Sequence, residues 1–476
     1  MTFSAERGIM PNTSFSCFKA YDLRGRVPEE LNPELAYKIG LAYAEVFSPR
    51  TVAVGYDIRL SSPSLRSALI EGLNKGGVDV KDIGLCGTEE IYHAVFSLGL
   101  DGGIMITASH NPKGYNGMKF VREQAIPVSG DSGLNKIKEL IRKDSLKVAA
   151  KSGKVELVDN TRKYIDHLLT YIEPGRLKPL KVVVDPGNGG GGKIIDLLEK
   201  VLPLNFIKLN NEPDGNFPCG VPNPLLPENR AKTSQAVLQH KADLGIAWDG
   251  DFDRCFFYDE NGEYIEGYYL VGLFAEMILG KHPGEKILHD PRLTWNTRKV
   301  VLQHGGVPLE TKTGHAFIKE RMRQEDAVYG GEMSCHHYFR DFSYCDSGMI
   351  PWLLVVELLS VSGKKISEFI SEAKAAFPSS GEINRRVESS EKCFKMIRDE
   401  FQGEALVFTE IDGLSFEYEN WRFNLRSSNT EPVIRLNVES KGDAAVVKDM
   451  TEKILRMIDS QAGILNGRSR SLTGFL

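Results

Sequence analysis

The sequence predicts an α/β protein of several domains, and two observations carry this prediction. First, 476 residues exceed one ordinary hydrophobic core, and at roughly 150 residues per domain they leave room for about three. Second, one plan recurs, in which an apolar strand leads into a turn rich in Asp, Gly or Pro and then into a helical pattern. It recurs at residues 51–57, 181–186 and 286–291. Continuous β-branched runs of this kind are typical of buried parallel strands.

The chain divides into four units, three α/β domains of related design and a smaller C-terminal one. A polar stretch at 143–154 precedes the first division, and the turn signals Asn261-Gly262 and Pro378-Ser379-Ser380-Gly381 mark the others. We expect domains at residues 1–158, 159–262, 263–380 and 381–476. The last domain reads as helix, strands, strand and helix at 391–402, 405–426, 433–439 and 443–460. This order favours α+β packing over a doubly wound sheet.

Composition excludes several classes of protein. With 41% hydrophobic and 26% charged residues the chain is typical of a soluble globular protein, and its net charge of −5 argues against nucleic acid as a partner. No apolar run is long enough to span a membrane, and the first residues lack the pattern of a secretory signal. The seven cysteines are irregularly spaced and form no CxxC pair, so we expect no disulfide framework, no zinc site and a cytoplasmic location.

The strongest chemical signal is the metal loop, residues 249–254. Asp249, Asp251 and Asp253 alternate along it between two apolar runs, so their carboxylates can converge on one hard cation such as Mg²⁺. A calcium loop is the main competitor, but Arg254 stands where its sharp turn needs glycine, and the flanks are typical of strands. The pattern favours a magnesium site.

The serine loop, residues 107–120, follows the small-residue run at 101–106, a candidate buried strand. Ser109 is presented beside Asn-Pro, and Lys119 follows ten residues later, near enough to return to the same site. No nucleophile elbow surrounds Ser109. Alone it is more typical of a turn residue, but together with three aspartates it indicates a serine that carries a phosphoryl group beside a metal ion.

The sugar loop, residues 330–338, gathers a carboxylate, a hydroxyl and two imidazoles after two glycines. Glu332, Ser334 and His336 could hydrogen-bond sugar hydroxyls and move a proton. For His337 a buried structural role is equally expected. His315, after Thr313-Gly314, offers another imidazole.

The anion loop, residues 426–432, lies between two strand-like runs. Arg426 can pair bidentately with phosphate, and Ser428, Asn429 and Thr430 can complete an anion pocket. This set of donors exceeds what an ordinary β-turn needs.

Residues 187–193 match the nucleotide-binding pattern G-x-x-x-x-G-K. Ile194, however, replaces the Ser or Thr that would hold Mg²⁺. We therefore interpret this glycine-rich turn as a tight strand-to-helix connection.

These four loops in this order, together with Phe18-Lys19-Ala20-Tyr21-Asp22-Leu23-Arg24-Gly25, resemble those of the α-D-phosphohexomutase family over nearly the whole chain. The form Gly331-Glu332-Met333-Ser334-x-His336 is most similar to bacterial phosphomannomutases, including those that also act as phosphoglucomutases. The resemblance implies four domains around a central cleft, the last with a TATA-binding-protein-like fold.

The resemblance also implies roles for individual residues. Ser109 would be phosphorylated and would bind Mg²⁺ with the three aspartates. Lys119 and His336 would transfer protons, in an order left open, and Arg24 and Arg254 would lie at the reacting group. Substrate-binding positions would be Tyr21, Arg292, His315, Glu332, Ser334, Arg426, Ser428, Asn429 and Thr430.

The implied activity is reversible transfer of a phosphoryl group between the 6- and 1-positions of mannose phosphate, through a hexose 1,6-bisphosphate that also serves as activator. Phosphoglucomutase or dual activity is the nearest alternative, and a Mg²⁺-dependent sugar phosphatase or a nucleotide-dependent enzyme lies outside the family. We expect a phosphorylated hexose as the substrate, no membrane partner, and a monomer or homodimer.

Overall fold

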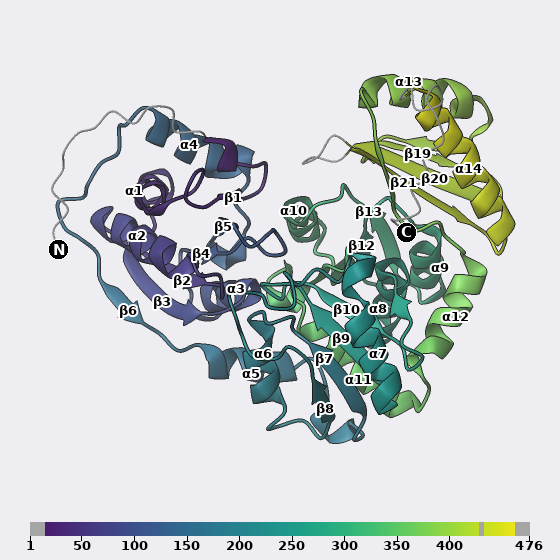
Figure 1. The fold of residues 1–476 in the computed structure, drawn as a ribbon, viewed down its shortest axis with the longest axis horizontal. Coiled ribbons are helices and arrows are strands. Elements are labelled where there is room, and N and C mark those ends of the chain that lie inside the picture. Colours follow the sequence, from purple (N-terminus) through teal and green to yellow (C-terminus); the bar gives the residue numbers. More distant parts are fainter. Residues whose placement is uncertain (1–14, 428–432, 462–476) are drawn as a thin grey trace.

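The computed structural model describes residues 15–427 and 433–461, which form four sheets, each with its own helices (Figure 1). The first and fourth domains lie at the two ends of an arc, with the second and third between them. None of the helices in these residues has both the length and the apolar character needed to cross a membrane.

The first domain holds a six-stranded sheet in the order β1-β5-β4-β2-β3-β6. Its strands are β1 (Leu23–Arg26), β2 (Thr51–Tyr56), β3 (Asp79–Leu85), β4 (Gly102–Ile106), β5 (Tyr115–Arg122) and β6 (Val155–Leu157). Its helices are α1 (Pro33–Phe47), α2 (Ser62–Lys75), α3 (Thr88–Ser97) and α4 (Asn135–Arg142).

The second domain has the sheet order β11-β10-β9-β7-β8. Its elements are α5 (Thr161–Leu169), β7 (Lys181–Asp185), α6 (Gly191–Leu198), β8 (Asn205–Lys208), α7 (Ala231–His240), β9 (Leu244–Trp248), β10 (Cys255–Tyr258) and β11 (Tyr264–Ile265). The turn at Asn261-Gly262 joins β10 to β11, so this sheet continues beyond the division that we placed at 262.

The third domain has the order β13-β12-β14-β15-β16. Its strands are β12 (Lys286–His289), β13 (Val307–Glu310), β14 (Tyr329–Gly331), β15 (His337–Phe339) and β16 (Cys345–Asp346). Its helices are α8 (Gly267–Lys281), α9 (Trp295–Gln303), α10 (His315–Glu325), α11 (Ile350–Ser362) and α12 (Ile366–Ala376).

These three sheets share one topology. In each, a first strand (β2, β7 or β12) lies between the second and the third, parallel to both, and a fourth strand then pairs antiparallel with the third. The first strands are the three segments that repeat one plan in the sequence. The structure thus confirms the prediction of three related mixed α/β domains.

The fourth domain is an antiparallel sheet in the order β17-β21-β20-β19-β18, packed with two helices. Its elements are β17 (Ile383–Arg386), α13 (Ser390–Phe401), β18 (Val407–Thr409), β19 (Leu414–Glu417), β20 (Trp421–Ser427), β21 (Val433–Ser440) and α14 (Ala444–Gln461). The α+β prediction is confirmed, although β17 was not expected. It is an edge strand whose sequence, Ile-Asn-Arg-Arg, lacks the apolar alternation of a half-buried strand.

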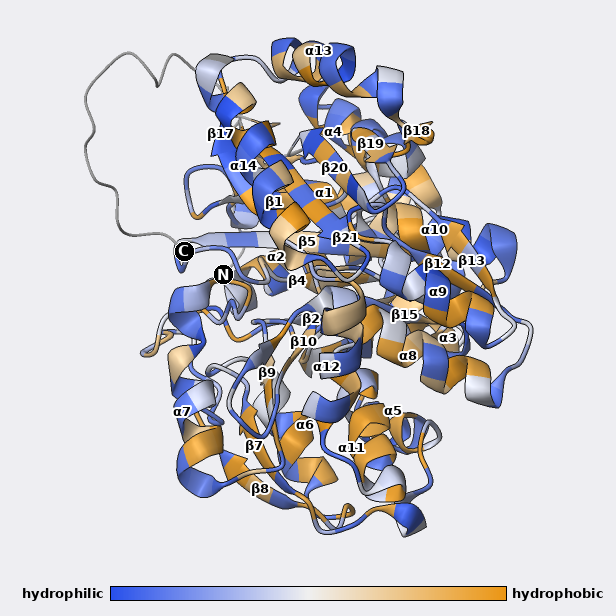
Figure 2. Cartoon of the chain, turned by 90° about the vertical axis from the view of Figure 1, so that its right-hand side faces the viewer, coloured by the Kyte–Doolittle hydropathy of each residue, from blue (hydrophilic) through white to orange (hydrophobic). Residues whose placement is uncertain are grey.

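One apolar cluster spans the first three domains, a second covers the other face of the first sheet, and the fourth domain has its own. A single buried cluster runs from Ala53 through Val182 to Phe377, while residues from Cys393 to Ile458 form a separate one. Figure 2 shows apolar residues dominating β7 and α11, and α11 is buried around most of its circumference. A helix that is apolar all round is stable only between packed layers.

Polar contacts attach the fourth domain to the third. Glu439 on β21 is fully buried; its Oε1 accepts hydrogen bonds from Thr294 N at 2.7 Å and Arg422 Nη1 at 2.9 Å. The Tyr268 hydroxyl donates to its other oxygen. Arg422 also donates to the carbonyl oxygens of Pro291 and Arg292. The buried Arg422–Glu439 pair therefore holds the Arg292 segment against the fourth domain.

Replacing Glu439 with alanine removes the fully buried charge partner of Arg422 and leaves only Glu417, whose Oε1 lies 3.5 Å from Arg422 Nε. We expect the free energy of unfolding to fall by ~3–5 kcal/mol, measured by urea unfolding followed by tryptophan fluorescence. The control is Glu400→Ala, which removes an exposed pair with Lys453 and should cost ~0–1 kcal/mol. Equal, small losses in both variants would contradict this account of the domain contact.

Candidate active site

Three of the four predicted loops occupy equivalent positions in the three related sheets. The serine loop joins β4 to β5, the metal loop joins β9 to β10, and the sugar loop joins β14 to β15. Each loop begins at the carboxyl end of the third strand of its sheet, β4, β9 or β14. There the chain has crossed from one side of the first strand to the other. Such switch points are where open α/β sheets bind ligands.

The metal loop brings three buried carboxylates together. Asp249, Asp251 and Asp253 each offer an oxygen within 4.8 Å of the others, and the Oδ1 atom of each is buried without a hydrogen-bond partner. Buried oxygens of this kind fit a hard divalent cation such as Mg²⁺. The strands β9 and β10 flank the loop as a hairpin, with Trp248 opposite Cys255, which differs from the two helices of a calcium loop.

Two buried cations offset the negative charge of the metal loop. Lys119 Nζ lies 2.6 Å from Asp251 Oδ2 and 2.5 Å from Asp253 Oδ2, and Arg254 Nη2 lies 2.7 Å from Asp249 Oδ2. Burial disfavours the charged form of Lys119, but Asp251 and Asp253 outweigh it and raise its pKa. Burial raises the pKa of Asp249 to about 6, partly countered by Arg254.

Ser109 faces the metal loop. Its Oγ donates to Asp249 Oδ2 at 2.7 Å and lies 3.1 Å from His110 Nδ1. Its φ of 48° is left-handed, which a serine adopts only where its surroundings impose it. Arg24 supports the loop, because Nη1 donates to Ala108 O at 3.0 Å and to Asn111 Oδ1 at 2.5 Å.

The sugar loop is held by its own carboxylate. Glu332 is buried and accepts hydrogen bonds from Tyr338 at 2.6 Å and from the Gly314 amide at 3.1 Å. His336 Nδ1 lies 3.2 Å from Glu332 Oε2, and its Nε2 lies 3.8 Å from Asp253 Oδ1, so the sugar loop meets the metal loop. Burial disfavours the imidazolium of His336, but Glu332 and Asp253 outweigh it and raise the pKa of His336.

The other residues of this region differ in position. Ser334 Oγ lies 3.3 Å from His336 Nδ1. His337 is a core residue, fully buried with Nδ1 2.7 Å from the Tyr329 hydroxyl, and burial lowers its pKa to about 3. His315 meets Tyr21 of the first domain, with ring centroids 6.0 Å apart, and burial lowers its pKa to about 3 as well.

Arginines gather around Glu382 where the third and fourth domains meet. Arg292 Nη1 lies 3.2 Å from Glu382 Oε2, Arg426 Nη2 lies 3.6 Å from it, and Arg435 Nη1 lies 3.0 Å from Oε1. Arg435 faces Arg426 directly across β20 and β21. Like charges opposite each other in a sheet are unfavourable unless an anion offsets them, and Glu382 supplies that anion here. The same guanidinium groups could pair with a phosphate. Ser428, Asn429 and Thr430 lie outside the described residues.

Sequence reasoning missed Arg59, which braces the serine loop from below. The residue is 2% exposed, and its guanidinium donates to four carbonyl oxygens, of Ser109 at 2.8 Å, Asn111 at 2.6 Å, and Pro112 and Tyr115 both at 3.0 Å. Arg59 follows β2, and β2 pairs with β4, which leads to Ser109. The sequence did contain a signal for this role. Arg59 is a charged residue shortly after β2, and the loop after a neighbouring parallel strand lies within its reach.

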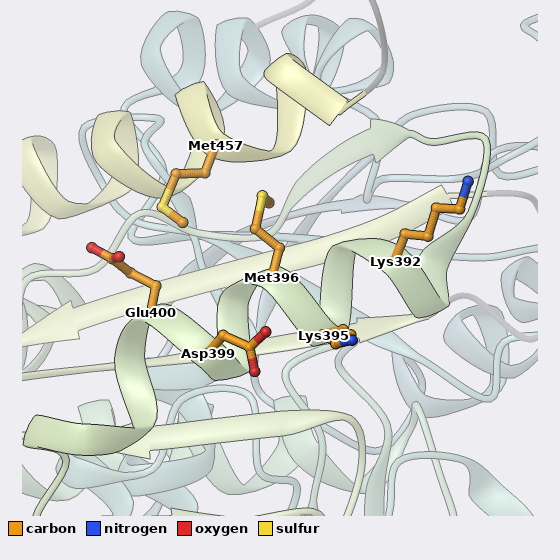
Figure 3. A pocket seen from close by; sticks show the side chains of 6 residues that line it. All are labelled: Lys392, Lys395, Met396, Asp399, Glu400 and Met457. Atoms are coloured by element: carbon orange, nitrogen blue, oxygen red, sulfur yellow. The ribbon is translucent and has the colours of Figure 1, made fainter.

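A hollow of about 450 Å³ on the fourth domain holds none of the predicted site residues. Side chains of α13 and α14 line it, as Figure 3 shows, and they are Lys392, Lys395, Met396, Asp399, Glu400 and Met457. Its four charged groups carry two positive and two negative charges, so it favours neither anion nor cation.

Replacing Arg59 with lysine keeps its charge but removes the planar fork that reaches four carbonyls. We expect amide hydrogen exchange in residues 107–117 to accelerate roughly 10–100-fold, because hydrogen bonds to charged groups contribute ~1.5–3 kcal/mol. The control Arg50→Lys changes an exposed arginine and should leave this exchange unchanged. Slow exchange retained in Arg59→Lys would contradict the bracing role.

Family models match all four domains. Those for the α/β/α domains I, II and III of phosphoglucomutase/phosphomannomutase match residues 16–147, 162–262 and 266–377, and that for its C-terminal domain matches 382–457.

Individual relatives agree with the family models. A phosphomannomutase of Escherichia coli is 55% identical over 94% of this chain and 100% of the relative, and the "phosphohexose mutases" protein of Xanthomonas campestris pv. campestris is 54% identical over 93% and 98%. A crystal structure of a phosphoglucomutase/phosphomannomutase family protein from Burkholderia thailandensis is 32% identical with a TM-score of 0.86, covering 96% of this chain and 99% of that one. The chain therefore belongs to the phosphoglucomutase/phosphomannomutase family, the α-D-phosphohexomutases.

Proposed function

We propose that this protein is a phosphomannomutase, which interconverts mannose 6-phosphate and mannose 1-phosphate through a phosphoserine at position 109 and a hexose 1,6-bisphosphate. The observation that carries the proposal is the Ser109 Oγ, 2.7 Å from Asp249 Oδ2 at the edge of three clustered carboxylates. A hydroxyl so placed suits a phosphoryl carrier beside a cation. The phosphomannomutases among the relatives support mannose phosphate as the substrate.

The donor set fits Mg²⁺. Asp249, Asp251 and Asp253 would hold the ion together with a phosphoryl oxygen on Ser109, and the three unpartnered Oδ1 atoms support this assignment. When bound, Mg²⁺ would neutralise the negative charge that develops on the transferring phosphoryl group. Arg24 and Arg254 would add positive charge from the protein itself.

The reaction consists of two transfers in opposite directions. In the first, the bond from phosphorus to Ser109 Oγ breaks as one forms to the free hydroxyl oxygen of a hexose monophosphate, and the hydroxyl proton passes to a side chain. In the second, the other phosphoryl group returns to Ser109, and the sugar oxygen that it leaves takes up a proton. Lys119 and His336 are the proposed proton-transfer groups. Their raised pKa values favour the charged forms, from which a proton can be donated to the sugar oxygen.

Substrate recognition is proposed to use residues of the first, third and fourth domains. Glu332, Ser334 and His336 would bind the sugar hydroxyls, and Tyr21 and His315 would lie beside them. Arg292 and Arg426 would bind the phosphate that is not reacting, with Arg435 as an addition from the structure; their approach to Glu382 supports an anion site there. Ser428, Asn429 and Thr430 remain predicted members of this site.

Several broader features also belong to the proposal. We infer domain divisions near 158 and 380, with the division placed at 262 moved to just after Ile265, where the second sheet ends. We also infer a cytoplasmic enzyme that is a monomer or homodimer, no nucleic acid or membrane partner, and activation by hexose 1,6-bisphosphate. The seven free cysteines support a reducing compartment.

A second candidate is dual action on mannose and glucose phosphates. The broader name of the Xanthomonas relative favours it. Turnover of mannose 1-phosphate and glucose 1-phosphate measured side by side separates the two, because a phosphomannomutase should prefer the first and a dual enzyme should use both at similar kcat/KM.

Ser109→Ala removes the oxygen that would carry the phosphoryl group. We expect the mutase rate to fall on the order of 10³-fold or more, measured as isomer formation with hexose 1,6-bisphosphate present. The control is Ser152→Ala, which changes an exposed serine of the first domain and should keep the rate.

Two outcomes would overturn the proposed function. One is a near-normal mutase rate in Ser109→Ala. The other is release of inorganic phosphate by the wild-type enzyme at the rate of isomer formation, which would indicate a phosphatase.

A further inference from the structure

The glycine-rich turn at 187–193 has no role in the proposed reaction. Its position nevertheless corresponds to that of the segments that support the serine loop in the first domain and the sugar loop in the third. In the first domain Arg59, after β2, holds the serine loop. In the third, Asp290, after β12, accepts a hydrogen bond from Met333 N of the sugar loop at 2.7 Å. The glycine-rich turn follows β7, the equivalent strand, so by position it should support the metal loop.

The glycine-rich turn meets the metal loop at two residues: Gly190 donates its amide to Gly250 O at 3.4 Å, and Gly190 also lies against Phe252, between Asp251 and Asp253. The Phe252 ring is fully buried. A Cβ atom added to Gly190 would lie 3.1 Å from the ring carbon Cε1. On the side of the first domain, a Cβ atom added to Gly87 would lie 2.1 Å from Cζ, closer than any real contact. The ring therefore fills a slot with one glycine wall from each domain.

Asp251, which precedes Phe252, is hydrogen-bonded to the residue that follows Gly87. Thr88, next to Gly87 and at the start of α3, donates its amide to Asp251 O at 3.2 Å, and its hydroxyl donates to Asp251 Oδ2. Phe252 itself has a φ of 46°, a conformation that is unfavourable for a bulky residue and persists only when its surroundings impose it.

We propose that Phe252 is a positioning residue, whose ring, held between Gly87 and Gly190, fixes the three carboxylates of the metal loop relative to Ser109 across the contact between the first two domains. The glycine-rich turn is then one wall of this slot and not a nucleotide site. The catalytic meaning of this inference rests on the proposed function, whereas metal binding tests it without any sugar substrate.

The direct test is Gly87→Ala, whose Cβ would overlap the edge of the Phe252 ring. We expect Mg²⁺ binding to the full-length dephosphorylated protein, measured by calorimetric titration, to weaken roughly 10–100-fold, as for other residues that orient metal ligands. The kcat should fall while KM for mannose 1-phosphate changes little, because the proposed sugar contacts lie in other loops. The control is Gly175→Ala, whose added Cβ meets nothing within 4 Å.

A second variant separates this slot from general loss of structure. Adding Phe252→Ala to Gly87→Ala removes the overlap, so the double variant should bind Mg²⁺ more tightly than Gly87→Ala alone. Unchanged Mg²⁺ binding in Gly87→Ala, or losses in the double variant equal to the product of the single losses, would overturn the proposal.

If Gly87→Ala does not fold, Phe252→Leu and Phe252→Ala decide. A larger loss of Mg²⁺ affinity in the alanine variant supports the slot, and wild-type affinity in both overturns it.

Discussion

Three carboxylates buried on one short loop repel one another and lose the solvation of water, so they remain ionised only where cations are supplied. Arg254 supplies one charge from the metal loop itself, but Lys119 comes from β5 in the first domain. The site is thus complete only when the first two domains are docked. The apolar cluster that runs through the first three domains provides this docking, and the oxygens that Lys119 and Arg254 leave unpartnered are those that a divalent cation fits.

The repeated topology explains how each of the three loops is held in place by a segment of its own domain. Each third strand ends beside the first strand of its sheet, so the segment after the first strand lies directly beneath the loop after the third. Those segments use different chemistry: the Arg59 fork in the first domain, glycine against Phe252 in the second and the Asp290 carboxylate in the third. One residue of each of the three loops adopts a left-handed backbone conformation: Ser109 in the serine loop, Phe252 in the metal loop and Cys335 in the sugar loop. Bracing of this kind is what makes such strain tolerable.

Much of the architecture could be predicted from sequence, because each first strand is a mainly apolar segment that contains or is directly followed by an Asp at its carboxyl end, which local pattern detects. The four loops could also be predicted, since each concentrates polar side chains within a few residues. Arg59, Arg435 and the role of Phe252 could not, because their importance depends on which strand ends are neighbours. The edge strand β17 could not be predicted because its sequence lacks apolar alternation. The second domain boundary was misplaced because a turn such as Asn261-Gly262 has the same sequence signal within a sheet as between domains.

The central claim is that Ser109 carries the phosphoryl group between substrate and product, and transfer of label tests it most directly. Enzyme bearing a radioactive phosphoryl group on Ser109 is mixed with unlabelled mannose 1-phosphate and stopped within a few turnovers. The account predicts that label leaves the protein at least as fast as isomer forms and appears in hexose phosphates. Label that stays on the protein during turnover, or appears only as inorganic phosphate, would contradict it.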